Sequence, residues 1–247
     1  MSRFPLFLSL AMLAASATSL AHATDAATAE PRTVDYDWMS VATWQEKHAA
    51  DVAIAQQGGI DIVFVGDSIT EGWEWNEGIE WKKRFEPLRA ANFGIGGDTT
   101  QNLLWRLDHG AIGTLRPKLV VLLIGTNNLG RENATADEVV RGIKAILGRL
   151  RTGYPDATIL LHGIFPCDAS PSAEIRTRVA AVNHQLRALD GLDGKVLFRD
   201  IGARFLEPDG SISTAVMADG LHPTPEGYRR WADVLEPEVR RLLASGN

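Results

Sequence analysis

Short apolar runs recur along the chain from residue 60 onward. Within each run nearly every position is hydrophobic, so the runs do not alternate between polar and apolar residues. Continuous runs of this length are typical of strands that are covered on both faces, as in parallel sheets. The predicted strands are residues 60–65, 119–124, 158–164 and 196–198, with a weaker one at 90–93.

Amphipathic patterns lie between and after these runs, with apolar residues spaced about 3.6 positions apart, as on one face of a helix. Thr135 and Glu138 form a capping box before the first pattern, and Thr224 followed by Pro225 is expected to begin the last. A further helix is predicted over residues 41–56. The three apolar stripes are Val139, Val140, Ile143, Ile146, Leu147 and Leu150; Ile175, Val179, Val182, Leu186 and Leu189; and Tyr228, Trp231, Leu235, Val239 and Leu242.

Strands that alternate with helices in this way predict βαβ crossovers and a parallel sheet. We expect residues 36–247 to form one α/β domain of three layers, in which helices cover both faces of a sheet of about five strands. In such sheets the functional residues gather at the carboxyl ends of the strands. The segments that follow the strands are therefore the place to look for a site.

The first 23 residues differ in kind from the rest of the chain. They read "MSRFPLFLSLAMLAASATSLAHA", with Arg3 near the start, an apolar stretch, and an A-x-A motif that ends at Ala23. This is the pattern of a secretory signal peptide, whereas a membrane anchor would need a longer apolar stretch. We expect residues 1–23 to be removed, residues 24–35 to be a flexible lead, and the mature protein to be exported to the periplasm or secreted, without stable insertion in a membrane.

Composition argues against some classes of function. The chain has 247 residues, a net charge of −6 and a pI of about 5.5, whereas a nucleic-acid-binding protein would carry a basic face. Cys167 is the only cysteine, so no internal disulfide can form, and we expect it to be a half-buried small residue. The spacings typical of metal sites do not occur, so we expect no metal or other cofactor. The oligomeric state is not readable from the sequence.

Small and polar residues cluster where predicted strands end and before the last helix. "GDSIT" follows the first strand, "NFGIGGDTT" includes the end of the second, and "GTNN" follows the third; "DGLHPT" precedes the last helix. Ser68 in the first cluster is either a helix N-cap or a nucleophile, and Asp67 could equally be the cap. At a helix N-terminus the Ser68 backbone N–H would also point into the site, where the positive helix end favours an oxyanion.

A nucleophilic serine needs a base, and His222 is the best-placed histidine. It lies in a turn before the last helix, whereas His162 lies within a strand-like run and is expected to be a core residue. Asp219, three residues earlier, can bond to the imidazole Nδ1, although a backbone carbonyl could also orient the ring. The alternative for this segment is an Asp-Gly turn with an incidental histidine.

The two remaining clusters offer hydrogen-bond donors for an oxyanion. Gly97 offers a backbone N–H, and Asn127 offers a side-chain amide. Together with the Ser68 N–H they would make three donors for one oxygen, which suits acyl transfer. A dinucleotide-binding fingerprint is disfavoured because Thr99 stands where its last glycine belongs. Asp98 is expected to be the N-cap of the next helix.

The clusters together resemble the SGNH, or GDSL-type, hydrolase superfamily. The resemblance spans roughly residues 60–243, and "ANFGIGGDTTQNLLWRL" is most similar to the catalytic subunits of platelet-activating-factor acetylhydrolase. It implies a flavodoxin-like sheet, no metal, and hydrolysis of esters with small acyl groups. By this resemblance Ser68, His222 and Asp219 would be the catalytic triad, and Ser68, Gly97 and Asn127 the oxyanion hole. This chain has "GDSIT" instead of "GDSL" and an export signal that those subunits lack.

We therefore expect an exported serine esterase that hydrolyses short-chain, mainly acetyl, esters, with O-acetyl groups of carbohydrates as the expected substrates. The alternatives are a lysophospholipase or thioesterase of the same superfamily, and a glycan-binding protein without activity. Three tryptophans close after the serine, Trp73, Trp75 and Trp81, could be a sugar-stacking platform, but packing is favoured.

Overall fold

The computed structural model of the protein describes residues 25–75 and 78–245. Within these residues, five parallel strands form one sheet in the order β2-β1-β3-β4-β5. This is the strand order of the flavodoxin-like fold, so the predicted fold class is confirmed. The strands are β1 (Ile62–Gly66), β2 (Ala90–Gly94), β3 (Leu119–Leu123), β4 (Thr158–His162) and β5 (Val196–Arg199).

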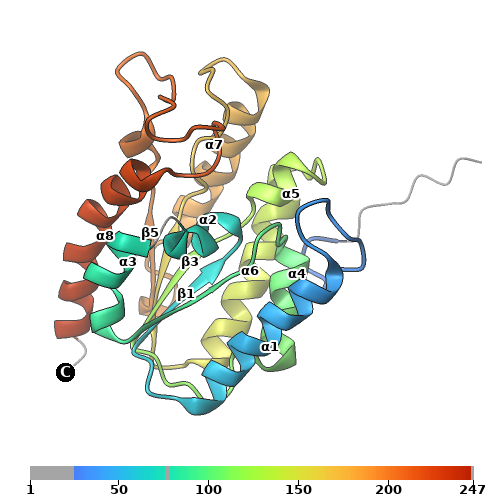
Figure 1. Ribbon diagram of the computed structural model, residues 1–247, viewed down its shortest axis with the longest axis vertical. Helices are drawn as coiled ribbons and strands as arrows, with labels where there is room; N and C mark the ends of the chain where they lie inside the picture. Colours follow the sequence, from blue (N-terminus) through green and yellow to red (C-terminus); the bar gives the residue numbers. More distant parts are fainter. Residues whose placement is uncertain (1–24, 76–77, 246–247) are drawn as a thin grey trace, which may run out of the picture.

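Helices lie on both faces of this sheet (Figure 1). One face is covered by α1, α4, α6 and α7, and the other by α3 and α8. The signal peptide expected at residues 1–23 lies outside the described residues. The α-helices are α1 (Val41–Gln57), α2 (Ser68–Glu71), α3 (Ile79–Arg84), α4 (Thr100–Arg106), α5 (Thr126–Gly130), α6 (Ala136–Gly153), α7 (Glu174–Leu186) and α8 (Pro225–Ser245).

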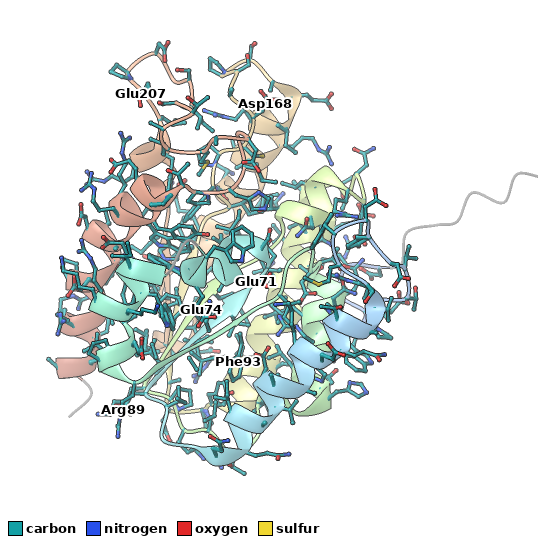
Figure 2. All side chains as sticks on the ribbon, viewed as in Figure 1. Glu71, Glu74, Arg89, Phe93, Asp168 and Glu207 are labelled. Atoms are coloured by element: carbon teal, nitrogen blue, oxygen red, sulfur yellow. The ribbon has the colours of Figure 1, made fainter. Side chains whose placement is uncertain are left out.

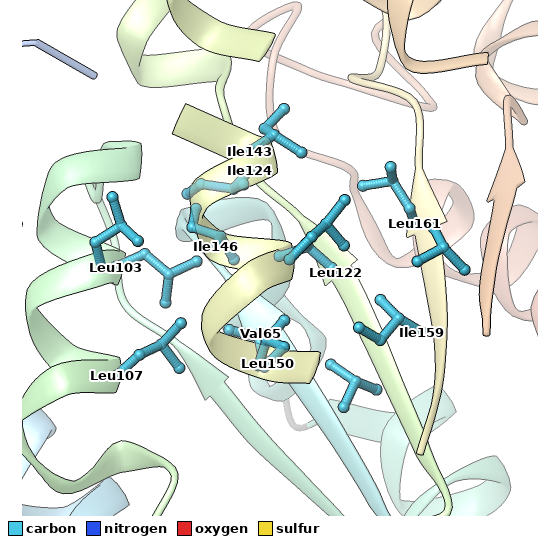
Figure 3. Close-up of a cluster of buried hydrophobic side chains, with 14 of the residues drawn as sticks. Val65, Leu103, Leu107, Leu122, Ile124, Ile143, Ile146, Leu150, Ile159 and Leu161 are labelled. Atoms are coloured by element: carbon cyan, nitrogen blue, oxygen red, sulfur yellow. The ribbon is translucent and has the colours of Figure 1, made fainter. Parts of the chain in front are cut away.

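The two faces of the sheet explain why its strands are apolar at successive positions. On one face Val65 and Leu122 pack with Ile146 of α6, and this cluster is drawn in Figure 3. On the other face Phe64 packs with Trp231 of α8 in a second cluster. Because residues of a strand point alternately to opposite faces, a strand between two layers of helices is hydrophobic throughout.

The predicted caps of two helices are confirmed. Thr135 precedes α6, and its side chain and that of Glu138 form the reciprocal bonds of a capping box. The Thr224 hydroxyl accepts a hydrogen bond from the backbone N–H of Gly227 at 3.3 Å, so it caps α8 one residue before Pro225. Within the described part of the chain, no helix combines the length and the apolar character that crossing a membrane requires.

Residues 25–35 differ from the flexible lead that the sequence suggested. They have little regular secondary structure, but they pack against the start of α4. The Thr100 hydroxyl donates to the carbonyl of Ala26 at 2.8 Å, and the Asn102 amide donates to the carbonyl of Glu30 at 3.1 Å. Ala26 is only 3% exposed. These bonds join distant segments, and hydrophobic periodicity therefore gives no sign of them.

Candidate active site

Three of the polar clusters follow neighbouring strands at one edge of the sheet. Ser68 follows β1, Gly97 follows β2 and Asn127 follows β3. β1 lies between the other two, and the chain runs from β1 outward to β2 before it crosses to β3. Ligands of doubly wound sheets bind at such a switch point. His222 reaches the same place from the loop before α8, since it lines one cavity together with these three residues.

Ser68, His222 and Asp219 form a continuous chain of polar contacts. The Ser68 Oγ lies 2.9 Å from Nε2 of His222, and Nδ1 of the same ring lies 2.7 Å from Oδ2 of Asp219. A carboxylate can only accept, so Nδ1 carries a proton towards Asp219 and Nε2 of the neutral ring is left to accept from the serine. The structure thus brings together the three residues that the sequence suggested.

The carboxylate of Asp219 is fixed by its own loop. Its Oδ1 accepts hydrogen bonds from the backbone N–H groups of Leu221 at 3.0 Å and His222 at 2.8 Å, while Oδ2 faces the imidazole. Partial burial acts to raise the pKa of Asp219, but the hydrogen bonds from His222 and Leu221 outweigh it and leave the pKa below its ordinary value. Asp219 therefore stays ionised and holds the ring of His222 through its side chain.

Asp67, and not Ser68, is the cap of α2. Its Oδ1 accepts the backbone N–H of Ile69 at 3.0 Å, which leaves the Ser68 hydroxyl for His222. The Tyr228 hydroxyl donates to the carbonyl of Ile69 at 2.8 Å and so ties α2 to α8. Complete burial raises the pKa of Asp67 to about 7, and its Oδ2 has no partner among the described residues.

The loop after β2 carries Gly97 with a backbone that glycine alone adopts easily. Its φ is +76°, and a Cβ at this position would lie 2.9 Å from the rings of Trp38 and Tyr36. Among the described residues, no acceptor is hydrogen-bonded to the backbone N–H of Gly97, which therefore remains available to a ligand in the cavity. Asn127 lies at the second position of α5, and one N–H of its side-chain amide donates to the carbonyl of Asp98 at 2.9 Å.

Asp98 is not the N-cap of α4, as the sequence suggested. Thr99 is the cap, and it forms a capping box with Asn102. Asp98 is completely buried and accepts from Nε1 of Trp44 and from Nε of Arg106, both at 2.7 Å. A buried carboxylate with an arginine partner is stabilised by the positive charge of that partner. Because Asp98 lies next to the helix start, the sequence could not distinguish a helix N-cap from a buried partner of an arginine.

A cavity of about 620 Å³ lies over Ser68. Its lining includes the other predicted site residues apart from Asp219, which stands behind His222. Glu71, the last residue of α2, also lines the cavity and is labelled in Figure 2. Lys47 pairs with Glu71 at 2.7 Å, so the wall carries charged as well as aromatic groups.

The three tryptophans after the serine have different roles. Trp73 and Trp81 are buried, with exposed fractions of 2% and 5%, and both rings pack on Phe64. The expectation of packing is confirmed for these two. Trp75 is 39% exposed and lines the cavity, with its ring centroid 5.5 Å from that of His222. It is therefore able to contact a substrate.

Two other residues singled out by the sequence are structural. Cys167 is buried, and burial raises the pKa of its thiol to about 11, so it is a poor nucleophile. His162 is a core residue, as expected, and its Nε2 accepts from Nε1 of Trp231 at 3.4 Å. Among the residues that the structure describes, no group of three or more histidine, cysteine or acidic side chains is arranged to hold a metal ion.

Sequence reasoning missed the contribution of the segment before α1. Trp38 and Met39 line the cavity, and Arg32 lies beneath the loop that carries Gly97. A signal was present, because Tyr36 and Trp38 are aromatic and flexible segments contain few aromatic residues. The segment lacks periodicity, and so it could not be placed against the sheet.

A serine, a histidine and a carboxylate in hydrogen-bond contact at the switch point of a flavodoxin-like sheet define a hydrolase site. The chain belongs to the GDSL-like lipase/acylhydrolase family, whose pattern matches residues 64–230. It is 38% identical over 200 residues to platelet-activating factor acetylhydrolase IB subunit alpha2 of Rattus norvegicus, covering 81% of this chain and 85% of the relative. It is 37% identical over 201 residues to subunit alpha1 of Homo sapiens, covering 81% and 84%.

Solved structures with the same fold extend this comparison. A GDSL-like lipase from Bacteroides thetaiotaomicron superposes with a TM-score of 0.65 at 21% identity, covering 81% of this chain and 98% of that one. An acetylxylan esterase from Geobacillus stearothermophilus superposes with a TM-score of 0.59 at 19% identity, covering 74% and 94%. At these identities the likeness establishes the fold.

Proposed function

We propose that this protein is a serine esterase that hydrolyses short-chain, mainly acetyl, esters, and that its substrates are O-acetyl groups on carbohydrates. The observation that carries the proposal is the contact between Ser68 Oγ and His222 Nε2 at 2.9 Å, continued at 2.7 Å to Asp219. A serine hydroxyl is a weak nucleophile until a base takes its proton, and this chain supplies one in the required tautomer.

In the proposed reaction, Ser68 attacks the carbonyl carbon of the ester while His222 takes the hydroxyl proton. The negative oxygen of the tetrahedral intermediate accepts from the N–H groups of Ser68 and Gly97 and from the Asn127 amide. Collapse expels the alcohol, to which His222 returns the proton. Water then attacks the acyl-serine with His222 again as base; His222 returns this proton to the Ser68 oxygen as the second intermediate collapses, and the acid is released.

Support for an acetyl group comes from the relatives. The proteins at 37–38% identity are named acetylhydrolases, and a protein of the same fold is an acetylxylan esterase. Support for a carbohydrate comes from two tryptophans on the cavity wall, Trp75 and the 56% exposed Trp38. Exposed aromatic rings combine an apolar face with a polar edge, which suits the apolar face of a sugar ring. The export signal that we expect at residues 1–23 would place the enzyme where such glycans occur.

The first test is substitution of the nucleophile. Ser68→Ala is expected to lower kcat on p-nitrophenyl acetate by about 10⁴-fold or more and to abolish labelling by a fluorophosphonate probe. Ser170→Ala, at an exposed serine of the loop after β4, is the matched control and should behave as the wild type. Undiminished activity of the Ser68 variant would refute the assignment, and an unlabelled, inactive wild type would indicate a binding protein.

The second test is a substrate series with purified protein. Activity should be greatest on acetyl esters among p-nitrophenyl esters of increasing acyl length, and among natural esters greatest on acetylated xylan, mannan or simple sugar acetates. A maximum at long acyl chains would instead identify a lysophospholipase or thioesterase. Preference for an acetylated phospholipid over every sugar acetate would contradict the carbohydrate assignment alone.

A further inference from the structure

Arg32 lies buried directly behind the loop that carries Gly97. Its side chain is 2% exposed, and its Nη2 donates to the carbonyl oxygen of Gly96 at 2.5 Å. The same nitrogen lies 3.4 Å from Oδ1 of Asp98, and Nη1 lies 3.2 Å from the Met39 sulfur. Arg32 comes from the segment before α1, outside residues 64–230 that match the family pattern.

The carbonyl that accepts from Arg32 belongs to the same peptide group as the Gly97 N–H. Donation to an amide oxygen withdraws electron density through the conjugated C–N bond and makes the N–H on the other side a stronger donor. A charged donor has a larger effect than a neutral one, and a guanidinium keeps its proton when it is buried. Arg32 therefore acts on one side of a planar group whose other side faces the cavity.

We propose that Arg32 is a positioning residue of the oxyanion hole, which orients the Gly96–Gly97 peptide and polarises the Gly97 N–H towards the oxygen of the tetrahedral intermediate. This inference rests on the proposed function, since it gives Gly97 a role in the same reaction. Arg32 itself does not reach the substrate, because its charged group is buried on the far side of the loop.

The surroundings of the loop leave this peptide little freedom. The Gly96 N–H donates to Oε2 of Glu71 at 2.7 Å, and the Asp98 N–H donates to the carbonyl of Ile95 at 3.2 Å. The peptides on either side are thus held by partners of their own. The Gly96 carbonyl would be free to rotate only if Arg32 were removed, and rotation would turn the Gly97 N–H away from the cavity.

The arginine is itself held by an aromatic and acidic frame. Its guanidinium carbon lies 4.6 Å from the centroid of the Tyr36 ring and 5.8 Å from that of Trp44. The Trp44 Nε1 donates to the Asp98 oxygen that also faces Arg32. Stacking and charge pairing compensate for the loss of solvation of the cation. Such a rigid placement suits a group that must be fixed before the reaction begins.

The test compares Arg32→Met and Arg32→Lys in the full mature chain. Loss of polarisation should lower kcat on p-nitrophenyl acetate by about 10-fold to 100-fold with little change in KM, which is less than the effect expected for loss of a whole oxyanion donor. The lysine variant keeps the charge and should recover most of that loss. Arg141→Met is the matched control and should leave kcat unchanged. It breaks the exposed ion pair, at 3.4 Å, between Arg141 and Asp25 of the segment that also carries Arg32.

A second readout separates positioning from general loosening of the fold. A boronic acid that adds to Ser68 forms a tetrahedral, negatively charged adduct, and its Kd should rise in the methionine variant by the same factor as kcat/KM falls. The melting temperatures of the variants should not rank in the same order as their kcat/KM values. Should Arg32→Met not fold, Arg32→Gln carries the same expectation. Wild-type kcat and boronate affinity in a folded neutral variant would overturn the proposal, whereas an inactive wild type would overturn the proposed function instead.

Discussion

At the scale of single residues, Asn127 uses only part of its hydrogen-bonding capacity inside the protein. One N–H of its side chain donates to the carbonyl of Asp98 at 2.9 Å, and the residue lines the cavity. A side-chain amide has two N–H groups, so the bond to Asp98 orients the second donor without consuming it. This arrangement makes Asn127 the donor whose removal disturbs the fold least.

Asn127→Ala is expected to lower kcat by about 10²-fold to 10³-fold, as loss of one oxyanion donor does. The lost bond to Asp98 should reduce the free energy of unfolding by only about 1 kcal/mol. Kinetics on p-nitrophenyl acetate together with urea unfolding would measure both. If stability fell as severely as activity, the residue would have a structural role instead.

Asp67 is a buried carboxyl whose pKa is raised to about 7. Such a group binds more protons in the folded than in the unfolded protein between pH 4 and pH 7, so the free energy of unfolding falls as the pH rises through that interval. Each unit of pKa difference corresponds to about 1.4 kcal/mol. Asp51 has a pKa of about 7 as well, so any test must isolate Asp67.

Asp67→Asn keeps an oxygen for the N–H of Ile69 and removes the titrating group. We expect the melting temperature of the variant, relative to the wild type, to increase from pH 5 through pH 7 and to level off towards pH 8. Calorimetry at several pH values measures this difference and cancels the contribution of Asp51. A difference that stays constant over this range would show that Asp67 is already ionised at pH 5.

At the scale of elements, helix starts differ in how far sequence defines them. The α6 cap was predictable because Thr135 and Glu138 interact within one turn. The α4 cap was not, since Asp98 and Thr99 are adjacent and both are good caps. Tertiary partners of Asp98, among them Trp44 and Arg106, withdraw its carboxylate from the helix start.

Thr135→Ala is expected to destabilise the protein by about 1 kcal/mol through loss of the α6 cap. The catalytic rate should not change, since neither residue of the capping box lines the cavity. Thr152→Ala in the same helix is the matched control, because the Thr152 hydroxyl only bonds back to the carbonyl of Gly148. Urea unfolding followed by tryptophan fluorescence would test both; equal stabilities would contradict the capping argument.

At the scale of the whole molecule, the site depends on segments from most of the chain. The segment before α1, the ends of β1, β2 and β3, and the loop before α8 all contribute to one cavity. The loop with His222 is supported by the loop after β4, since the Asp168 N–H donates to the carbonyl of Gly220 at 2.7 Å. We therefore expect activity to be lost in the same unfolding transition as the fold, and not in separate steps.

The export that we expect from the pattern of residues 1–23 can be tested directly on the whole chain. Expression of all 247 residues in a bacterium with a general secretion pathway should yield a protein outside the cytoplasm whose N-terminus is Thr24. Leu10→Arg, which interrupts the apolar stretch, should keep the protein inside with residues 1–23 attached. Intact-mass measurement distinguishes the two forms, and retention of residues 1–23 in the exported wild type would contradict cleavage after Ala23.

The sequence by itself determined the layers of this protein and the chemical identity of its candidate site. Apolar runs and amphipathic stripes are local patterns, and they gave the five strands and the main helices to within a few residues. Ser68, His222 and Asp219 could be named because each sits in a short polar cluster at a strand or helix end. What the tertiary structure alone decided is how the loop that carries Gly97 is held: Arg32, Trp38 and Asp98 act through contacts between distant segments, and such contacts have no period or spacing along the chain.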